Sequence, residues 1–157
     1  MEKIYLNDIL NIPVKNVNEY KIRFLIKDPD NEEPLDQILD NDNKIVEWTG
    51  WKQGAKFELT RKYVISFVRI YTEGKEYWLY LGTYDVEKRE DYKSKVGQGY
   101  DLKKVKEHEK YIKRLVVKYK NKIQNTKPNL ENIINDIEVY KIMSEEEVKD
   151  FYKIKRL

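Results

Sequence analysis

The sequence predicts an α+β fold: a small, curved or barrel-like mixed β-sheet of about six strands, with three or four short helices. Residues 20–27 alternate between apolar and polar side chains, and residues 62–86 contain two long strand-like runs joined by a polar turn. Residues 144–147 carry the residue pattern of a helix start. The 157 residues, with no cysteine among them, are enough to bury a core without disulfides. We therefore expect one domain over residues 1–157, with residues 144–157 as a C-terminal helix.

The first third of the chain predicts short elements separated by prolines. Residues 4–12 are apolar enough for a helical turn or two ended by Pro13, and the alternating residues 20–27 form the first strand. A turn-rich stretch follows. Residues 34–40 begin with proline and carry early acidic side chains, which predicts a short helix. Residues 44–54 are expected to form a strand interrupted at Gly50.

The strongest prediction is a β-hairpin over residues 62–86, with Glu73-Gly74 at its turn. Apolar side chains occupy both faces of each arm, which is typical of a strand that is covered on both sides or lines a closed barrel. Gly82 interrupts the aromatic row of the second arm. A glycine inside a strand often marks a bulge or the close approach of another group.

The C-terminal half predicts shorter elements. Residues 88–100 form a polar loop and residues 102–111 a short helix, followed by a strand with basic side chains over residues 112–120. Residues 130–143 are strand-like in their second half. Ser144 and Glu147 have the spacing of a capping box, so a terminal helix should begin there.

Several classes of function find no support in the residues. The sequence has no glycine-rich phosphate loop, and its single histidine, His108, lies in a charged segment where we expect it at the surface. We therefore expect neither a metal site nor a cofactor. No apolar run approaches the length of a membrane span, and the N-terminus lacks the pattern of a secretory signal. A cytoplasmic protein without membrane contact is the expectation.

Charge is distributed unevenly along the chain. Residues 28–47 hold eight acidic side chains and one lysine, whereas residues 101–128 hold ten basic side chains and three acidic ones. A basic segment of this kind indicates a polyanionic partner, although it is also compatible with a solvated surface. Our candidates for phosphate contacts lie in that segment: Lys113, Arg114, Lys118, Lys120 and Lys122.

Aromatic side chains on or beside the predicted strands suggest a second feature. They fill a core well, but they can also form a pocket in which a nucleic-acid base is stacked. Combined with the basic segment, they favour nucleic-acid binding. Our candidates for base contacts are Trp48, Trp51, Trp78, Tyr80 and Tyr84.

The order of several motifs resembles the N-terminal module that precedes the catalytic domain in a group of bacterial GIY-YIG nuclease family proteins. The resemblance covers roughly residues 6–142 and rests on the segments LNDIL, KIRF, PLD, WTGW, RKYVISFVRIY, WLYLGTYDV, YIKRLVVKYKN and LENIINDIEVYKI. The hairpin and its WLYLGTYDV strand also look like PUA-superfamily barrels, including the EVE domains.

This resemblance implies a PUA-like, EVE-like barrel that recognises a modified base, in DNA rather than RNA, and targets a restriction-type nuclease domain or subunit. LYLGTYD at residues 79–85 does not match the paired-tyrosine motif of the catalytic domain, so no catalytic residue is carried over. We expect this chain alone to be non-catalytic.

Two alternatives remain open from the sequence. Pro29-Asp30 followed by Asp42-Asn43-Lys44 matches the PD…DxK pattern of metal-dependent nucleases, in which two carboxylates and a lysine hold magnesium and orient water. The other alternative is a protein-interaction or dimerisation module that uses the acidic segment and the C-terminal helix.

Overall fold

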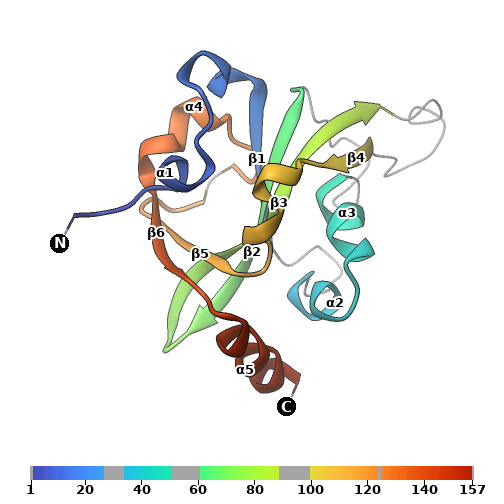
Figure 1. Cartoon of the computed structure of the whole chain (residues 1–157), viewed down its shortest axis with the longest axis vertical. Helices are drawn as coiled ribbons and strands as arrows, with labels where there is room; N and C mark the ends of the chain where they lie inside the picture. Colours follow the sequence, from blue (N-terminus) through green and yellow to red (C-terminus); the bar gives the residue numbers. More distant parts are fainter. Residues whose placement is uncertain (1, 27–33, 51–60, 89–99, 124, 157) are drawn as a thin grey trace.

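The computed structural model describes residues 2–26, 34–50, 61–88, 100–123 and 125–156, which form a mixed α+β fold (Figure 1). The elements follow in the order α1 (Leu6–Leu10), η1 (Val14–Glu19), β1 (Tyr20–Leu25), α2 (Pro34–Asp40), α3 (Asn43–Gly50), β2 (Tyr63–Thr72), β3 (Lys75–Lys88), β4 (Tyr100–Lys104), η2 (Lys106–Tyr111), β5 (Leu115–Tyr119), α4 (Leu130–Ile133), η3 (Ile134–Asp136), β6 (Ile137–Ile142) and α5 (Glu145–Arg156). The predicted fold class, a small mixed sheet with several short helices, is confirmed.

The six described strands form one sheet in the order β1-β2-β3-β5-β6, with β4 also paired to β3. Strands β1 and β2 are parallel, and all other pairs are antiparallel. The long strand β3 organises the sheet, because it pairs with β2 on one side and with both β4 and β5 on the other.

Irregular segments cover the two outer strands of this sheet. On β1, the backbone N–H groups of Ile22 and Phe24 donate to the carbonyls of Pro128 (2.9 Å) and Thr126 (2.8 Å). On β6, the N–H of Val139 donates to the carbonyl of Ile4 over 2.7 Å. These bonds satisfy groups that an open edge would leave exposed, and they draw the chain around the curved sheet.

The sheet is buried on both faces, as the apolar pattern of the hairpin predicted. One face packs against α1, η1 and α4, and its cluster includes Phe24, Phe67 and Leu130. The other face packs against α2, α3 and α5, and its cluster includes Trp48 and Val68. Most aromatic side chains of β2 and β3 thus have apolar neighbours whichever way they point, and Tyr71 near the hairpin turn is exposed.

Residues 43–50 form helix α3, so the strand predicted over residues 44–54 is wrong in its described part. Ile45 and Trp48 are three positions apart and both are buried, while Lys44 pairs with Glu47 at 2.9 Å. The Trp48 indole N–H also donates to Gln37 of α2 over 3.0 Å. A helical spacing of three therefore places the apolar side chains on one face. The rest of the predicted strand, residues 51–54, lies outside the described part of the chain.

Two further segments test the predictions. The helix expected over residues 102–111 does not form. Residues 102–104 belong to the end of β4, and residues 106–111 form the 3-10 segment η2. The capping box is confirmed: the Glu147 N–H donates to Ser144 Oγ, and the Ser144 N–H donates to Glu147 Oε1, each over 3.1 Å. Among the described residues, no helix has the length and apolar character needed to cross a membrane.

Candidate functional site

The aromatic side chains predicted to contact a base belong to the core instead. The exposed fractions of Trp48, Trp78, Tyr80 and Tyr84 are 0%, 1%, 0% and 3%. Because both faces of the sheet are covered, none of these four rings offers a face to a ligand, and the predicted pocket is wrong for them. Trp51 lies outside the described residues.

The two buried tyrosines use their hydroxyl groups within the fold. The Tyr84 hydroxyl donates to the carbonyl of Leu81 over 2.8 Å, and the Tyr80 hydroxyl lies 2.5 Å from Thr83 Oγ1. Burial raises the pKa of both Tyr80 and Tyr84 well above the ordinary value for tyrosine. Both side chains are therefore neutral structural groups.

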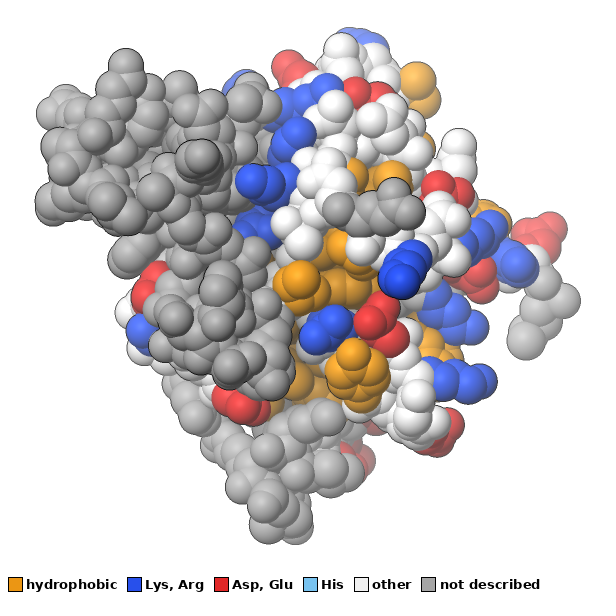
Figure 2. Space-filling model, turned by 180° about the vertical axis from the view of Figure 1, so that it is seen from behind, with side chains coloured by type: hydrophobic (Ala, Val, Ile, Leu, Met, Phe, Trp, Pro, Cys, Tyr) orange, Lys and Arg blue, Asp and Glu red, His pale blue; other side chains and the backbone are white. Residues whose placement is uncertain are grey.

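The predicted phosphate contacts do not form one continuous row. Lys113 forms an ion pair with Asp42, and Arg114 donates to the carbonyls of Met143 (2.9 Å) and Lys110 (3.3 Å), so both side chains serve to connect elements. The remaining candidates, Lys118, Lys120 and Lys122, are exposed at the end of β5 and beyond it. The view from behind likewise shows lysine and arginine in several separate groups (Figure 2).

Strand β3 contains a bulge close to the cleft that is described below. Ser66 of β2 pairs with Gly82, but the next residue, Phe67, pairs with Tyr80, which leaves Leu81 as the extra residue. Gly82 has φ of +125°, and a Cβ atom there would lie 2.8 Å from the hydroxyl oxygen of Tyr84. Both properties predicted for a glycine inside this strand, a bulge and a close approach, are present.

The segment between β4 and β5 is anchored to the edge of β3 at this bulge. The Val105 N–H donates to the carbonyl of Thr83, and the Lys113 N–H donates to the carbonyl of Tyr80, each over 2.8 Å. The 3-10 segment η2 lies between these two anchors. Its side chains are therefore held against the bulged part of β3.

His108 of η2 is buried, with 7% of its surface exposed, so the predicted surface position is wrong. Its Nε2 lies 3.0 Å from the carbonyl oxygen of Leu10, and its Nδ1 lies 2.8 Å from Thr83 Oγ1. Because a carbonyl only accepts, Nε2 carries a proton. Burial lowers the pKa of His108 and so favours the neutral imidazole, in which Nδ1 accepts from Thr83 and Thr83 accepts in turn from Tyr80.

The carbonyl that His108 contacts is fixed by the turn after α1. The side-chain amide of Asn7 binds the backbone of Ile12 twice: its oxygen accepts from the N–H at 2.8 Å, and its nitrogen donates to the carbonyl at 3.0 Å. Asn11 ends the helix in the left-handed conformation, with φ of 56°. The turn from Leu10 to Ile12 is thereby held opposite η2.

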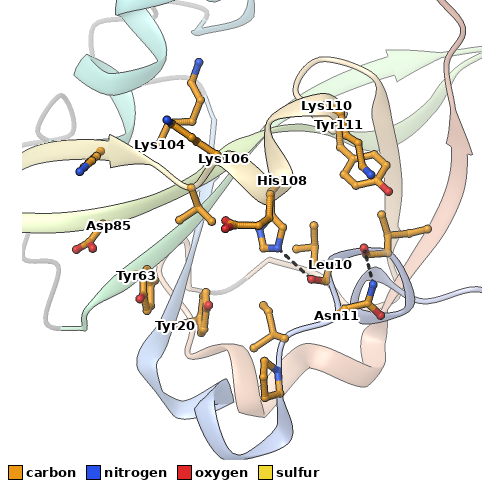
Figure 3. A pocket seen from close by; sticks show the side chains of 16 residues that line it. Leu10, Asn11, Tyr20, Tyr63, Asp85, Lys104, Lys106, His108, Lys110 and Tyr111 are labelled. Atoms are coloured by element: carbon orange, nitrogen blue, oxygen red, sulfur yellow. Dashed lines mark hydrogen bonds between the residues drawn. The ribbon is translucent and has the colours of Figure 1, made fainter.

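A cleft of about 710 Å³ lies between this turn, β4 and η2 (Figure 3). Tyr20 and Tyr63 form one wall, with their rings stacked at 4.7 Å between centroids and 19° between planes. Burial raises the pKa of Tyr20 to about 12, so its hydroxyl stays protonated. Asp85 lies beside Tyr63, and Tyr111 stands on the far side of His108 (Figure 3).

The rim of this cleft is basic. Four lysines of β4 and η2 line it, against the two carboxylates of Asp85 and Glu107. The lysines are Lys103, Lys104, Lys106 and Lys110. Each is exposed, and Lys104 also lies 3.4 Å from Glu109. The cleft therefore combines four ammonium groups, tyrosine rings and two carboxylates, which suits an anionic ligand that carries a polar ring.

The described residues do not assemble the PD…DxK arrangement. The Asp42 side chain is 82% exposed and paired with Lys113, and it precedes a helix rather than lying on a core strand. Lys44 pairs with Glu47. Asp30 lies outside the described residues, and within the described part of the chain no group of three or more acidic or histidine side chains could hold a metal ion.

Comparison with protein-family models, with curated proteins and with solved structures finds no match for this chain. The case for a function therefore rests on the cleft and on the charge around it.

Proposed function

We propose that this chain is a non-catalytic nucleic-acid-binding domain and that its binding site is the lysine-rimmed cleft. One observation carries the proposal: four exposed lysines of the basic segment surround a hollow, one wall of which is the stacked pair of Tyr20 and Tyr63. Lysine side chains supply the phosphate contacts that dominate nucleic-acid affinity, and aromatic groups contact bases and sugars. The cleft lies in the size range of small-ligand pockets, so one nucleotide unit fits it.

The carboxylate in the cleft adds a basis for selectivity. Asp85 repels phosphate but accepts hydrogen bonds from amino groups, as aspartate does toward the N4 amino group of cytosine. Lysines at the rim and a carboxylate inside thus suit a nucleotide whose phosphate stays outside and whose base enters. A modified base in DNA fits this proposal. In this proposal the domain positions a nuclease partner, which cleaves the nucleic acid, as the module that the sequence resembles does.

Salt dependence of binding tests the role of the rim. A panel of unmodified, methylated and hydroxymethylated duplexes and single strands would be titrated by fluorescence anisotropy at several salt concentrations. Replacing Lys106 and Lys110 by Gln removes two potential phosphate contacts, so affinity should fall about tenfold at low salt. The slope of log K against log salt should become shallower by about one for each lysine removed.

The control for each single replacement is Lys75→Gln, which removes one positive charge from the exposed start of β3, beside the hairpin turn. It should leave both affinity and slope close to those of the unaltered protein. Equal effects of the control and the cleft variants would reduce the proposal to general electrostatic attraction. Absence of binding to every oligonucleotide in the panel would refute it.

A further inference from the structure

A second surface, which shares no residue with the lining of the cleft, combines aromatic rings with lysines. Tyr140 of β6 stacks on Tyr77 of β3 with 4.2 Å between ring centroids and 21° between planes. Tyr77 is 6% exposed, whereas Tyr140 is 37% exposed. The Nζ atoms of Lys118 and Lys141 lie 5.4 Å and 5.8 Å from the centroid of the Tyr140 ring.

The same face continues across the sheet to the N-terminal segment. Lys118 pairs in register with Glu138, which in turn forms a bridge with Tyr5, so these three side chains lie side by side. Lys120 comes directly after β5, two residues beyond Lys118. Its Nζ lies 5.4 Å from the centroid of the Tyr5 ring. We call the surface formed by Tyr5, Lys118, Lys120, Tyr140 and Lys141 the tyrosine-lysine strip. Strands β5 and β6, which carry three of these residues, lie side by side (Figure 1).

The electrostatics of the strip favour an anionic partner. Glu138 pairs with Lys3 at 3.8 Å and Glu147 with Lys141 at 3.3 Å, whereas neither Lys118 nor Lys120 has an acidic partner among the residues described. Their nearest aromatic neighbours are the rings of Tyr140 and Tyr5. An apolar protein partner would have to desolvate both of these ammonium groups, whereas a phosphate chain would neutralise them.

We propose that the tyrosine-lysine strip binds single-stranded nucleic acid by stacking a base on Tyr140 and neutralising phosphates with Lys118 and Lys120. The ring of Tyr140 is already fixed by Tyr77, so little side-chain freedom is lost when a base stacks on it. Single strands expose base faces, which paired bases in a duplex keep stacked on one another. This inference rests on the proposed function for the class of ligand, but it assigns a separate site.

Affinity for an oligothymidylate of about 15 nucleotides tests the strip directly. Tyr140→Leu keeps an apolar side chain but removes the flat ring, and it should lower this affinity about tenfold. Duplex affinity should not change. Tyr140→Phe retains the ring and should bind as the unaltered protein does. Lys118→Gln combined with Lys120→Gln should weaken single-strand binding and reduce its salt slope by about 1.4.

Photocrosslinking identifies the contact. An oligonucleotide that carries 5-iodouracil should crosslink to Tyr140 or Tyr5, as located by mass spectrometry of the peptides. Crosslinks confined to Tyr63 or Tyr111, with full affinity in Tyr140→Leu, would overturn the strip and leave the cleft as the binding site. Loss of duplex binding together with single-strand binding in Tyr140→Leu, with single-strand affinity retained in the Lys118 and Lys120 variant, would also overturn the strip, because the ring would then support only the fold. Failure of the unaltered protein to bind any nucleic acid would overturn both proposals.

Discussion

His108 connects three segments that are far apart in the sequence, and for this reason its buried position could not be predicted from the residues around it. Its partners Thr83 and Leu10 are 25 and 98 positions away. Its immediate neighbours in KEHEK are charged and exposed, so the local sequence indicates a solvated position. The tyrosines of β3 were misjudged for a related reason, because the covering of both faces depends on helices elsewhere in the chain.

The pH dependence of stability should reflect this histidine. Burial lowers the pKa of His108 in the folded protein below its ordinary value of 6.5. The unfolded chain therefore binds a proton more readily as the pH falls below 6.5, and the free energy of unfolding should decrease in that range and level off below the folded-state pKa. Urea unfolding between pH 8 and pH 5 measures the effect.

His108→Gln supplies the comparison, since His108 is the only histidine in the chain. The variant should lose about 1–3 kcal/mol at pH 8, because two buried polar groups lose well-placed partners. Its free energy of unfolding should then change less between pH 8 and pH 5 than that of the unaltered protein. Parallel pH profiles for the two proteins would contradict the neutral, buried imidazole.

Gly82 is the second residue with a specific requirement. Its φ of +125° disfavours other residues, and a Cβ atom would lie within 3.0 Å of three atoms of the Tyr84 ring and hydroxyl. That ring is fixed by burial and by its bond to the Leu81 carbonyl. Gly82→Ala should therefore lower the free energy of unfolding by about 2–4 kcal/mol. Equilibrium denaturation measures it.

Gly74 provides a matched control for that substitution. Its φ is +76°, but no atom lies within 4 Å of an added Cβ. Gly74→Ala should cost only about 1 kcal/mol, since backbone strain alone opposes it. Equal costs at the two glycines would show that the contact with Tyr84 contributes nothing.

Among the elements, those with strong local signals were predicted well. The β2–β3 hairpin was predicted from its turn sequence. In the structure both Glu73 and Gly74 adopt positive φ, of 54° and 76°, as a two-residue turn of type I′ requires. Helix α3 was not predicted from the sequence, because its short apolar stretch fits a strand as well as a helix. The deciding contact, from Trp48 to Gln37, joins it to α2.

Helix α5 depends on its N-terminal cap. Ser144→Ala removes the hydroxyl that accepts from the Glu147 N–H, and it should destabilise the helix by about 1 kcal/mol. Backbone amides of α5 should then exchange with solvent faster, as hydrogen exchange with mass spectrometry would measure. Ser144→Asp keeps an acceptor at the cap and should retain slow exchange. Unchanged exchange in both variants would argue that Val148 and Phe151, which pack on the core, hold the helix without the cap.

At the scale of the whole molecule, the basic segment is divided among different tasks. Its first lysines surround the cleft, Lys113 and Arg114 hold neighbouring elements in place, and its last lysines lie on or beyond the tyrosine-lysine strip. A charge count identifies such a segment but not this division, because the division follows from the direction that each strand and turn gives to its side chains. The cleft itself draws on five separate stretches of sequence, so no local pattern could predict it.

The position of β1 has a consequence for the order in which the molecule can fold. This strand is made early in synthesis, yet its parallel partner β2 and the carbonyls of Thr126 and Pro128 arrive much later. Bringing them together closes long loops, which slows folding, whereas the β2–β3 hairpin needs only its own turn. A nascent chain should therefore carry a formed hairpin first, with β1 able to pair with β2 from then on, while the other edge of β1 stays open until residues 126–128 have been made.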